Sequence, residues 1–146
     1  MEESMSLLLG IRDVFGCKNV DIRTYSPLTL AFVGDCIYDL VIRTVVVERG
    51  NTAPHPLHQK KSAVVKAQAQ AAQAEAVFGE LTEEEQAVYK RGRNAHSHSS
   101  AKNASIGDYR KATGLEALYG FLYLTDRTER LLYLVKKSLE LTGTEL

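Results

Sequence analysis

Two stretches of this chain have the composition of helices but carry almost no charge. Residues 27–47 contain three charged side chains, spaced four apart, and residues 112–125 contain one, Glu116. The three are Asp35, Asp39 and Arg43. Residues four apart share one face of a helix, and a helix that is apolar on its other faces must be buried. The two segments therefore predict the centre of a helical core.

Capping signals and apolar spacing predict helices along the rest of the chain, and no segment alternates as a strand would. Ser26 followed by Pro27 is a typical helix start and Gly50 a typical end, while Thr82 and Glu85 form a capping box. We expect helices at residues 4–15, 27–49, 57–78, 83–94 and 108–124, and a polar loop at residues 95–107. A last helix, capped by Thr125 or Asp126, should run to about Leu141. The expected fold class is all-α, a helical bundle.

Length and composition exclude several classes of protein. A chain of 146 residues fits one domain, residues 1–146, with its core at about residues 26–141. The acidic start excludes a secretory signal, and the lack of an apolar run of about 18 residues excludes a membrane helix. Cys17 and Cys36 form neither a disulfide scaffold nor a zinc cluster. They are typical of free thiols in a reducing compartment, which favours a cytoplasmic protein, and we expect Cys36 to pack in the core.

Charge is unevenly distributed along the chain, although its formal sum is zero. Five acids and no base lie in residues 75–85, whereas six bases and one acid lie in residues 86–111. A basic stretch of this kind indicates a polyanion as the partner. The alternative is a solvated face, which is the usual place for a cluster of lysines.

Asp35 and Glu116 are carboxylates inside the two apolar helices. A buried carboxylate is costly unless it is paired or bound to a metal. Mg²⁺ takes oxygen ligands, usually one or two carboxylates together with water and phosphate, so the two acids could converge on a divalent ion. The alternative is structural: Asp39 could pair with Arg43 one turn away, and Glu116 could satisfy backbone groups or an arginine of another element.

Four segments of the sequence, taken in order, resemble motifs of the ribonuclease III family. The apolar segment around Asp35 is similar to the family's signature helix, and the segment that begins with Glu116 is similar to its second acidic motif. Two further segments resemble the smaller Mini-III branch, which lacks a separate double-stranded-RNA-binding domain, and we expect no such domain after Leu141. The four segments are residues 30–38, 57–62, 90–95 and 116–124. The resemblance covers roughly residues 26–141.

This resemblance implies a ribonuclease III-type endonuclease domain in which Asp35 and Glu116 are catalytic and hold the metal. Mg²⁺, or Mn²⁺ as the alternative, would activate a water and neutralise charge at the scissile phosphate. In-line attack would leave a 5′-phosphate and a 3′-hydroxyl, as in the family. The implied substrate is double-stranded RNA, specifically the paired ends of precursor 23S ribosomal RNA, and a ribosomal protein that presents it is a candidate partner. Gly34 and Gly120 would either permit close helix approach or serve ordinary packing.

Two departures from the larger family bear on the metal count. Its four-carboxylate pattern has acids where this chain has Ala31 and Thr113, so only two of the four carry over. One metal per site and two metals per site therefore stay open. Asp39, one turn after Asp35, is a candidate outer-shell residue, with pairing to Arg43 as the other interpretation.

Basic residues would hold the RNA. Lysine and arginine contacts to phosphates are independent of base sequence, and A-form RNA is recognised by its shape and its 2′-hydroxyls. The candidate RNA-binding residues are His58, Lys60, Lys61, Lys66, Lys90, Arg91, Arg93, Asn94 and Lys102.

A homodimer is implied as well. Cutting both strands of a duplex takes two acidic sites, which two-fold symmetry would supply, and the family is dimeric through the signature helix. The candidate interface residues are Phe32, Val33, Ile37 and Tyr38, with an intrachain core as the alternative.

Two other functions stay open at this point. One is a non-catalytic RNA-binding domain of the same fold in ribosome assembly, against which the retention of both acids argues. The other is a helical adaptor that binds protein, which the basic stretch disfavours.

Overall fold

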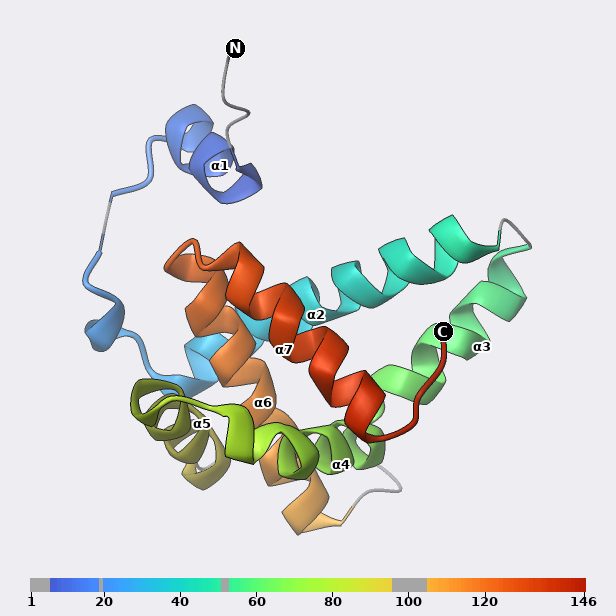
Figure 1. The fold of residues 1–146 in the computed structure, drawn as a ribbon. Coiled ribbons are helices and arrows are strands. Elements are labelled where there is room, and N and C mark those ends of the chain that lie inside the picture. The colour runs from blue at the N-terminus through green and yellow to red at the C-terminus, as the bar shows by residue number, and fades with distance from the viewer. Residues whose placement is uncertain (1–5, 19, 51–52, 96–104) are drawn as a thin grey trace.

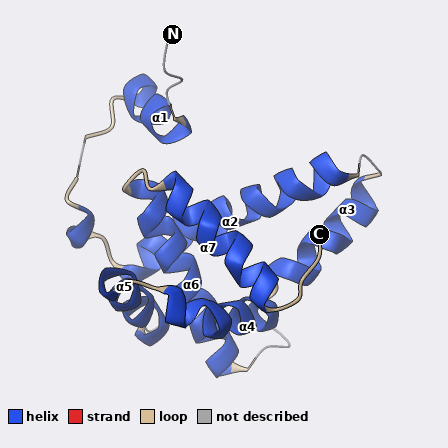
Figure 2. Cartoon of the chain, viewed as in Figure 1, coloured by secondary structure: helices blue, strands red, loops and turns tan. Residues whose placement is uncertain are grey.

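The structure, a computed structural model, describes residues 6–18, 20–50, 53–95 and 105–146 (Figure 1). Within these ranges every regular element is a helix and none is a strand (Figure 2). The α-helices are α1 (Leu7–Phe15), α2 (Pro27–Arg49), α3 (Pro54–Val65), α4 (Ala67–Val77), α5 (Glu83–Asn94), α6 (Ile106–Leu124) and α7 (Thr128–Leu141). Two short 3₁₀ helices are η1 (Ile22–Thr24) and η2 (Phe78–Glu80). The expected all-α fold is confirmed for the described residues.

α6 lies at the centre of the bundle (Figure 1). It packs against α2, α4 and α5, and α7 packs against α4 and α6. Every residue from Ala112 to Leu122 is buried except Glu116, which is half-buried. The expected burial of this segment is therefore confirmed, and Glu116 is the one charge in it.

α2 is buried on one face only. Its core face holds Leu30, Ala31, Tyr38, Ile42 and Val46. On the opposite face Phe32 is 81% exposed, and Cys36 is exposed as well. The expectation that Cys36 packs in the core is wrong, because the apolar composition of α2 does not distinguish the face that meets the core from the face that points outward.

The backbones of α2 and α6 touch at two glycines. A Cβ atom on Gly34 would overlap the carbonyl oxygen of Glu116, and a Cβ atom on Gly120 would overlap the carbonyl oxygen of Leu30. Only glycine permits this approach, so close helix contact, and not ordinary packing, is the role of both residues. Because Gly34 precedes Asp35 and contacts Glu116, the crossing determines where the two carboxyls meet.

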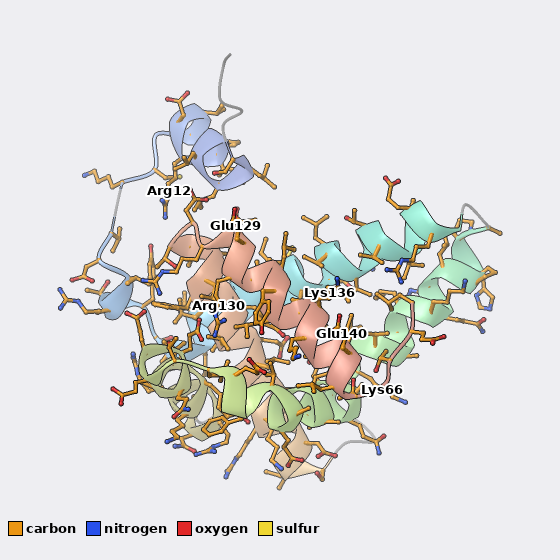
Figure 3. The ribbon with its side chains drawn as sticks, viewed as in Figure 1. Arg12, Lys66, Glu129, Arg130, Lys136 and Glu140 are labelled. Atoms are coloured by element: carbon orange, nitrogen blue, oxygen red, sulfur yellow. The ribbon has the colours of Figure 1, made fainter. Side chains whose placement is uncertain are left out.

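α5 approaches α6 in a similar way. A Cβ atom on Gly92 or Gly114 would come within 2.7 or 2.8 Å of an atom of the facing helix. At the other end of α5 the capping box of Thr82 and Glu85 is present as expected. Glu85 also accepts two hydrogen bonds of 2.8 Å from Arg130 of α7 (Figure 3). α5 is therefore fixed at both ends.

The single helix expected over residues 57–78 is in fact two helices, because the chain turns at Lys66. This residue has extended backbone angles, φ −66° and ψ 152°, where α3 ends and α4 begins. The side-chain amide of Gln73 donates to the carbonyl oxygen of Val64 at 3.1 Å, and its amide oxygen accepts a hydrogen bond from the Tyr38 hydroxyl at 2.5 Å. These buried hydrogen bonds hold the turn, and the helical composition of the segment does not reveal them.

Four helices begin at residues other than those expected. α1 begins three residues late, at Leu7, because Ser6 caps it by accepting a hydrogen bond from the backbone N–H of Leu9 at 3.2 Å. α3 begins three residues early, at Pro54, a residue that is tolerated at the first helical position. α6 begins two residues early, because Ser105 caps it by accepting a hydrogen bond from the backbone N–H of Asp108 at 3.0 Å. α7 begins at Thr128 with Arg127 at the cap position, so the expected cap at Thr125 or Asp126 is wrong; Asp126 has a left-handed backbone with φ 56°.

We expect Gly34→Ala to destabilise the fold strongly. Its methyl group would overlap a backbone oxygen that no rotamer change can move, so α2 and α6 would have to separate. The free energy of unfolding should fall by about 3 kcal/mol or more, as measured by denaturant titration. The matched control is Gly107→Ala in α6, where the new Cβ meets only Ser105 Oγ at 3.9 Å. That variant should be as stable as the wild type or more so, and equal stability of Gly34→Ala would contradict the backbone contact.

Candidate active site

Asp35 and Glu116, the acidic pair, lie together in a groove. The groove has a volume of about 910 Å³ and is lined by residues of α1, α2, α3 and α6. Asp35 is exposed to it, Glu116 is half-buried, and the two carboxyls are close enough that Asp35 raises the pKa of Glu116. The structure therefore brings together the two acids that the sequence singled out.

The surroundings of the acidic pair favour a proton on Glu116. Burial is the largest cause that raises the pKa of Glu116 from 4.5 to about 9, and the hydrogen bond and charge of Asp35 act in the same direction. Two carboxylates this close repel each other unless a proton or a cation lies between them. A divalent cation would relieve the same repulsion and displace the proton.

The donor set of the groove fits a hard divalent cation. Mg²⁺ usually takes one or two carboxylates and completes its shell with water and phosphate oxygens. Within the described residues no group of three or more His, Cys, Asp or Glu side chains could hold a metal.

Ala31 and Thr113, which stand where the larger family has acids, line the same groove. The Thr113 hydroxyl donates to the carbonyl oxygen of Tyr109 at 3.0 Å.

Asp39 lies one turn beyond Asp35 in the same groove and is paired with two cations. Its Oδ2 accepts a hydrogen bond from Arg43 Nε at 2.7 Å, and its Oδ1 lies 3.5 Å from Lys61 Nζ. The expected pairing of Asp39 with Arg43 is confirmed. The ion pair with Lys61 joins α2 to α3, and the sequence did not reveal it.

The candidate RNA-binding residues of α5 lie at the end of that helix which packs against α6. Gly92 packs against α6 at Ala117 and Gly114, on either side of Glu116, so the basic end of α5 is held at this level of α6. Arg91 and Asn94 are exposed there, and Arg93 is half-buried. The guanidinium of Arg93 lies 5.7 Å from the centre of the Tyr89 ring, and the ammonium of Lys90 lies 5.7 Å from that of Phe78.

The remaining basic candidates are distributed over α3 and the turn after it. His58, Lys60 and Lys66 are exposed, whereas Lys61 is turned into the groove. Lys102 lies outside the described residues.

The four candidate interface residues separate into two groups. Phe32 is exposed, and Val33 and Ile37 are half-buried. Tyr38 is fully buried, with its ring stacked on Tyr119 at a centroid distance of 5.4 Å. For Tyr38 the structure supports the alternative, a place in the intrachain core, and the expectation of an interface role is wrong.

Sequence reasoning missed part of the groove lining. Tyr109 and Tyr123 of α6 line the groove, as do Leu7 and Ile11 of α1. Tyr109 precedes Glu116 by seven residues, a helical spacing that places both on one face, so this signal was present in the sequence. No comparable signal links α1 to the groove, because its attachment depends on Arg12, whose guanidinium donates to the carbonyl oxygen of Leu124 at 2.8 Å (Figure 3).

In the described part of the chain no helix is long and apolar enough to cross a membrane.

Comparison with known proteins shows what the chain is similar to. Residues 28–127 match the Ribonuclease III domain. The chain is 47% identical to the Mini-ribonuclease 3 of Enterococcus faecalis over 84% of this chain and 95% of that one. It is 39% identical to the Mini-ribonuclease 3 of a Thermoanaerobacter species over 96% and 97% of the two chains. Its fold superposes on the crystal structure of a Fusobacterium nucleatum protein with a TM-score of 0.74 and 30% identity, over 82% and 96% of the two chains.

The match to the domain covers well over half of the chain, and the relatives are aligned over nearly their whole lengths. The resemblance noted in the sequence is thereby confirmed. The chain belongs to the Mini-III branch of the ribonuclease III family and is an endoribonuclease.

Proposed function

We propose that this endoribonuclease is metal-dependent and cleaves double-stranded RNA. The observation that carries the proposal is the acidic pair, two interacting carboxyls that line one open groove. In the proposed hydrolysis a water oxygen bonds to phosphorus while the bond from phosphorus to the 3′ oxygen breaks. The water gives up a proton and the 3′ oxygen gains one, so the products are a 5′-phosphate and a 3′-hydroxyl.

Asp35 and Glu116 would hold the divalent cation, Mg²⁺ or, as the alternative, Mn²⁺. When bound, the cation supplies an activated water and neutralises charge on the phosphate. The chain itself keeps the two carboxyls in register, because the contact of Gly34 with Glu116 fixes their backbones. Asp39 would reach the cation only through water, in competition with its own ion pairs.

Cations at the rim of the groove would hold the RNA backbone. The Gly92 contact fixes the end of α5 against the segment of α6 that contains Glu116, and Arg91 is exposed at that end. The exposed basic residues of α3 and the turn after it would extend this contact. Contacts of this kind bind duplexes independently of sequence and weaken with salt. The exposed basic residues of α5 and α3 therefore support a polyanion as the substrate.

A homodimer would supply the second cut. Each chain has one acidic pair, and a duplex has two strands. The outward apolar face of α2 supports this proposal, because exposed apolar side chains that gather on one helix are typical of an interface. This face includes Leu28, Phe32 and Leu40, and it continues into the groove wall.

For the natural substrate we propose the paired ends of precursor 23S ribosomal RNA, with a ribosomal protein as the partner that presents them. Membership of the Mini-III branch supports this choice. The whole chain, residues 1–146, would act as one catalytic domain.

We expect Asp35→Asn and Glu116→Gln each to abolish cleavage of a long RNA duplex in Mg²⁺ and to leave binding intact, because both remove a metal ligand and no phosphate contact. Gel analysis of the products and fluorescence anisotropy of the duplex measure the two effects. Glu48→Gln, at the exposed end of α2, is the control and should cut normally. Binding without cutting by the wild type, on a plain duplex and on the paired ribosomal ends alike, would instead support a non-catalytic role in ribosome assembly.

The acidic pair also predicts a pH dependence of stability. Between pH 4.5 and about 9 the folded protein holds a proton on Glu116 that the unfolded chain has lost, so the free energy of unfolding should fall as pH rises. Glu116→Gln removes this titration. Without divalent ions, the wild type should therefore lose at least about 1 kcal/mol relative to Glu116→Gln between pH 5 and pH 9, measured by thermal unfolding. Mg²⁺ should restore the wild type alone, and parallel pH profiles of the two proteins would contradict the assignment.

We expect Phe32→Glu to dissociate the proposed dimer, because it places a charge on the outward face of α2. Light scattering should give twice the 16.2 kDa chain mass for the wild type. The variant should raise the dimer Kd by about 30-fold or more, the effect of losing one interface hot spot. Leu141→Glu, at an exposed leucine of α7, is the matched control and should stay dimeric. A wild type that is monomeric at high concentration would refute the dimer.

A further inference from the structure

One cation, Lys61 of α3, lies inside the acidic groove and not on the surface. It lines the groove together with the acidic pair, and its side chain is only 13% exposed. The other basic residues of α3, His58 and Lys60, are exposed. Lys61 therefore differs from the cations that would bind phosphates along the outside of the protein.

The charge of Lys61 is not fully balanced by its neighbours. Asp39 already accepts the hydrogen bond from Arg43 at 2.7 Å, whereas its other oxygen, Oδ1, lies 3.5 Å from the Lys61 ammonium. Among the described residues this oxygen has no hydrogen-bond partner. Two cations share one carboxylate, so the three side chains sum to one positive charge. The ammonium has three N–H donors, which another acceptor in the groove could use.

An RNA phosphate at the acidic pair would be such an acceptor. Asp39 follows Asp35 by one helical turn, so its ion pair holds the ammonium of Lys61 one turn away from the acidic pair. A divalent cation at the acidic pair would balance the negative charge of the two carboxyls. The phosphate would then bring further negative charge to the groove. Preorganised donors contribute most where charge develops in the transition state.

We propose that Lys61 is a catalytic residue that contacts the reacting phosphate, and that Asp39 holds its ammonium in the groove. This inference rests on the proposed function and adds a third chemical group to the acidic pair. It also gives Lys61 a different role from Arg91. Arg91 is exposed at the end of α5, so it would contact a neighbouring phosphate and contribute to binding.

The competing role for Lys61 is a structural tether between α3 and α2. A partly screened ion pair of this length contributes little to stability. A tether would also leave the rate of the chemical step unchanged in a folded variant. The two roles therefore differ in kcat.

The test is steady-state cleavage of an RNA duplex in Mg²⁺ by the wild type and by Lys61→Met, Lys61→Arg, Arg91→Gln and Lys136→Met. Lys136 is the matched control, because its ammonium also lies beside a carboxylate, 4.0 Å from Glu140, but on α7 (Figure 3). Duplex binding without divalent ions and thermal unfolding are measured on the same proteins.

We expect Lys61→Met to lower kcat about 100-fold, with KM and duplex binding within about threefold of the wild type. Lys61→Arg should recover part of the activity, because it restores the charge. Arg91→Gln should raise KM and keep kcat, and Lys136→Met should match the wild type in both.

A folded Lys61→Met protein whose kcat is within about threefold of the wild type would overturn the proposal. If Lys61→Met does not fold, Lys61→Gln replaces it under the same criterion. Duplex cleavage by the wild type and by Lys136→Met shows that the proposed function holds, so that an active Lys61→Met refutes only the role of Lys61. If the wild type cuts no duplex, both proposals fall.

Discussion

The backbone contact between α2 and α6 is the constraint on which the rest of the structure depends. Two glycines allow the helices to cross without side chains between them, and the large residues on either side then pack closely. Tyr38 stacks on Tyr119 at 5.4 Å with the rings 14° apart. The same crossing places Asp35 against Glu116 and leaves the opposite face of α2 turned outward. One contact thus positions both the acidic pair and the apolar surface proposed as the dimer interface.

The acidic pair costs stability where it lies. Glu116 is the one charge in the buried run of α6, and its neighbour in the groove is another acid. A proton removes the charge repulsion, but the cost of burial stays, because the buried carboxyl still loses contact with water. Any cation that binds the folded chain and not the unfolded one adds stability, so affinity for a cation and the instability of the empty pair have the same physical origin. Active sites commonly concentrate such unfavourable groups.

Sequence reasoning succeeded where the signals were local. The capping residues of α2 and α5 and the burial of α6 follow from spacing within single helices. The two acids stood out because each lies in an apolar segment that resembles a motif of the family. It failed where a partner lies far away in the chain. The turn at Lys66 depends on hydrogen bonds of Gln73 to Val64 and Tyr38, and the outward position of Cys36 depends on which face of α2 meets α6. Helical periodicity identifies residues that share a face, but in a helix that is apolar on several faces it does not identify the face that is covered.

Two adjacent residues of α2, Tyr38 and Asp39, link the turn at Lys66 to the acidic groove. Tyr38 points inward and holds α4 through Gln73, while Asp39 faces the groove and is paired with Lys61 of α3. The turn that separates α3 from α4 is therefore fixed on its buried side by a hydrogen bond and on its groove side by an ion pair. The extended backbone at Lys66 lets α3 pack against α2 while α4 packs against α6. The break in helical regularity is what allows a cation from a separate element to lie one turn from the acids.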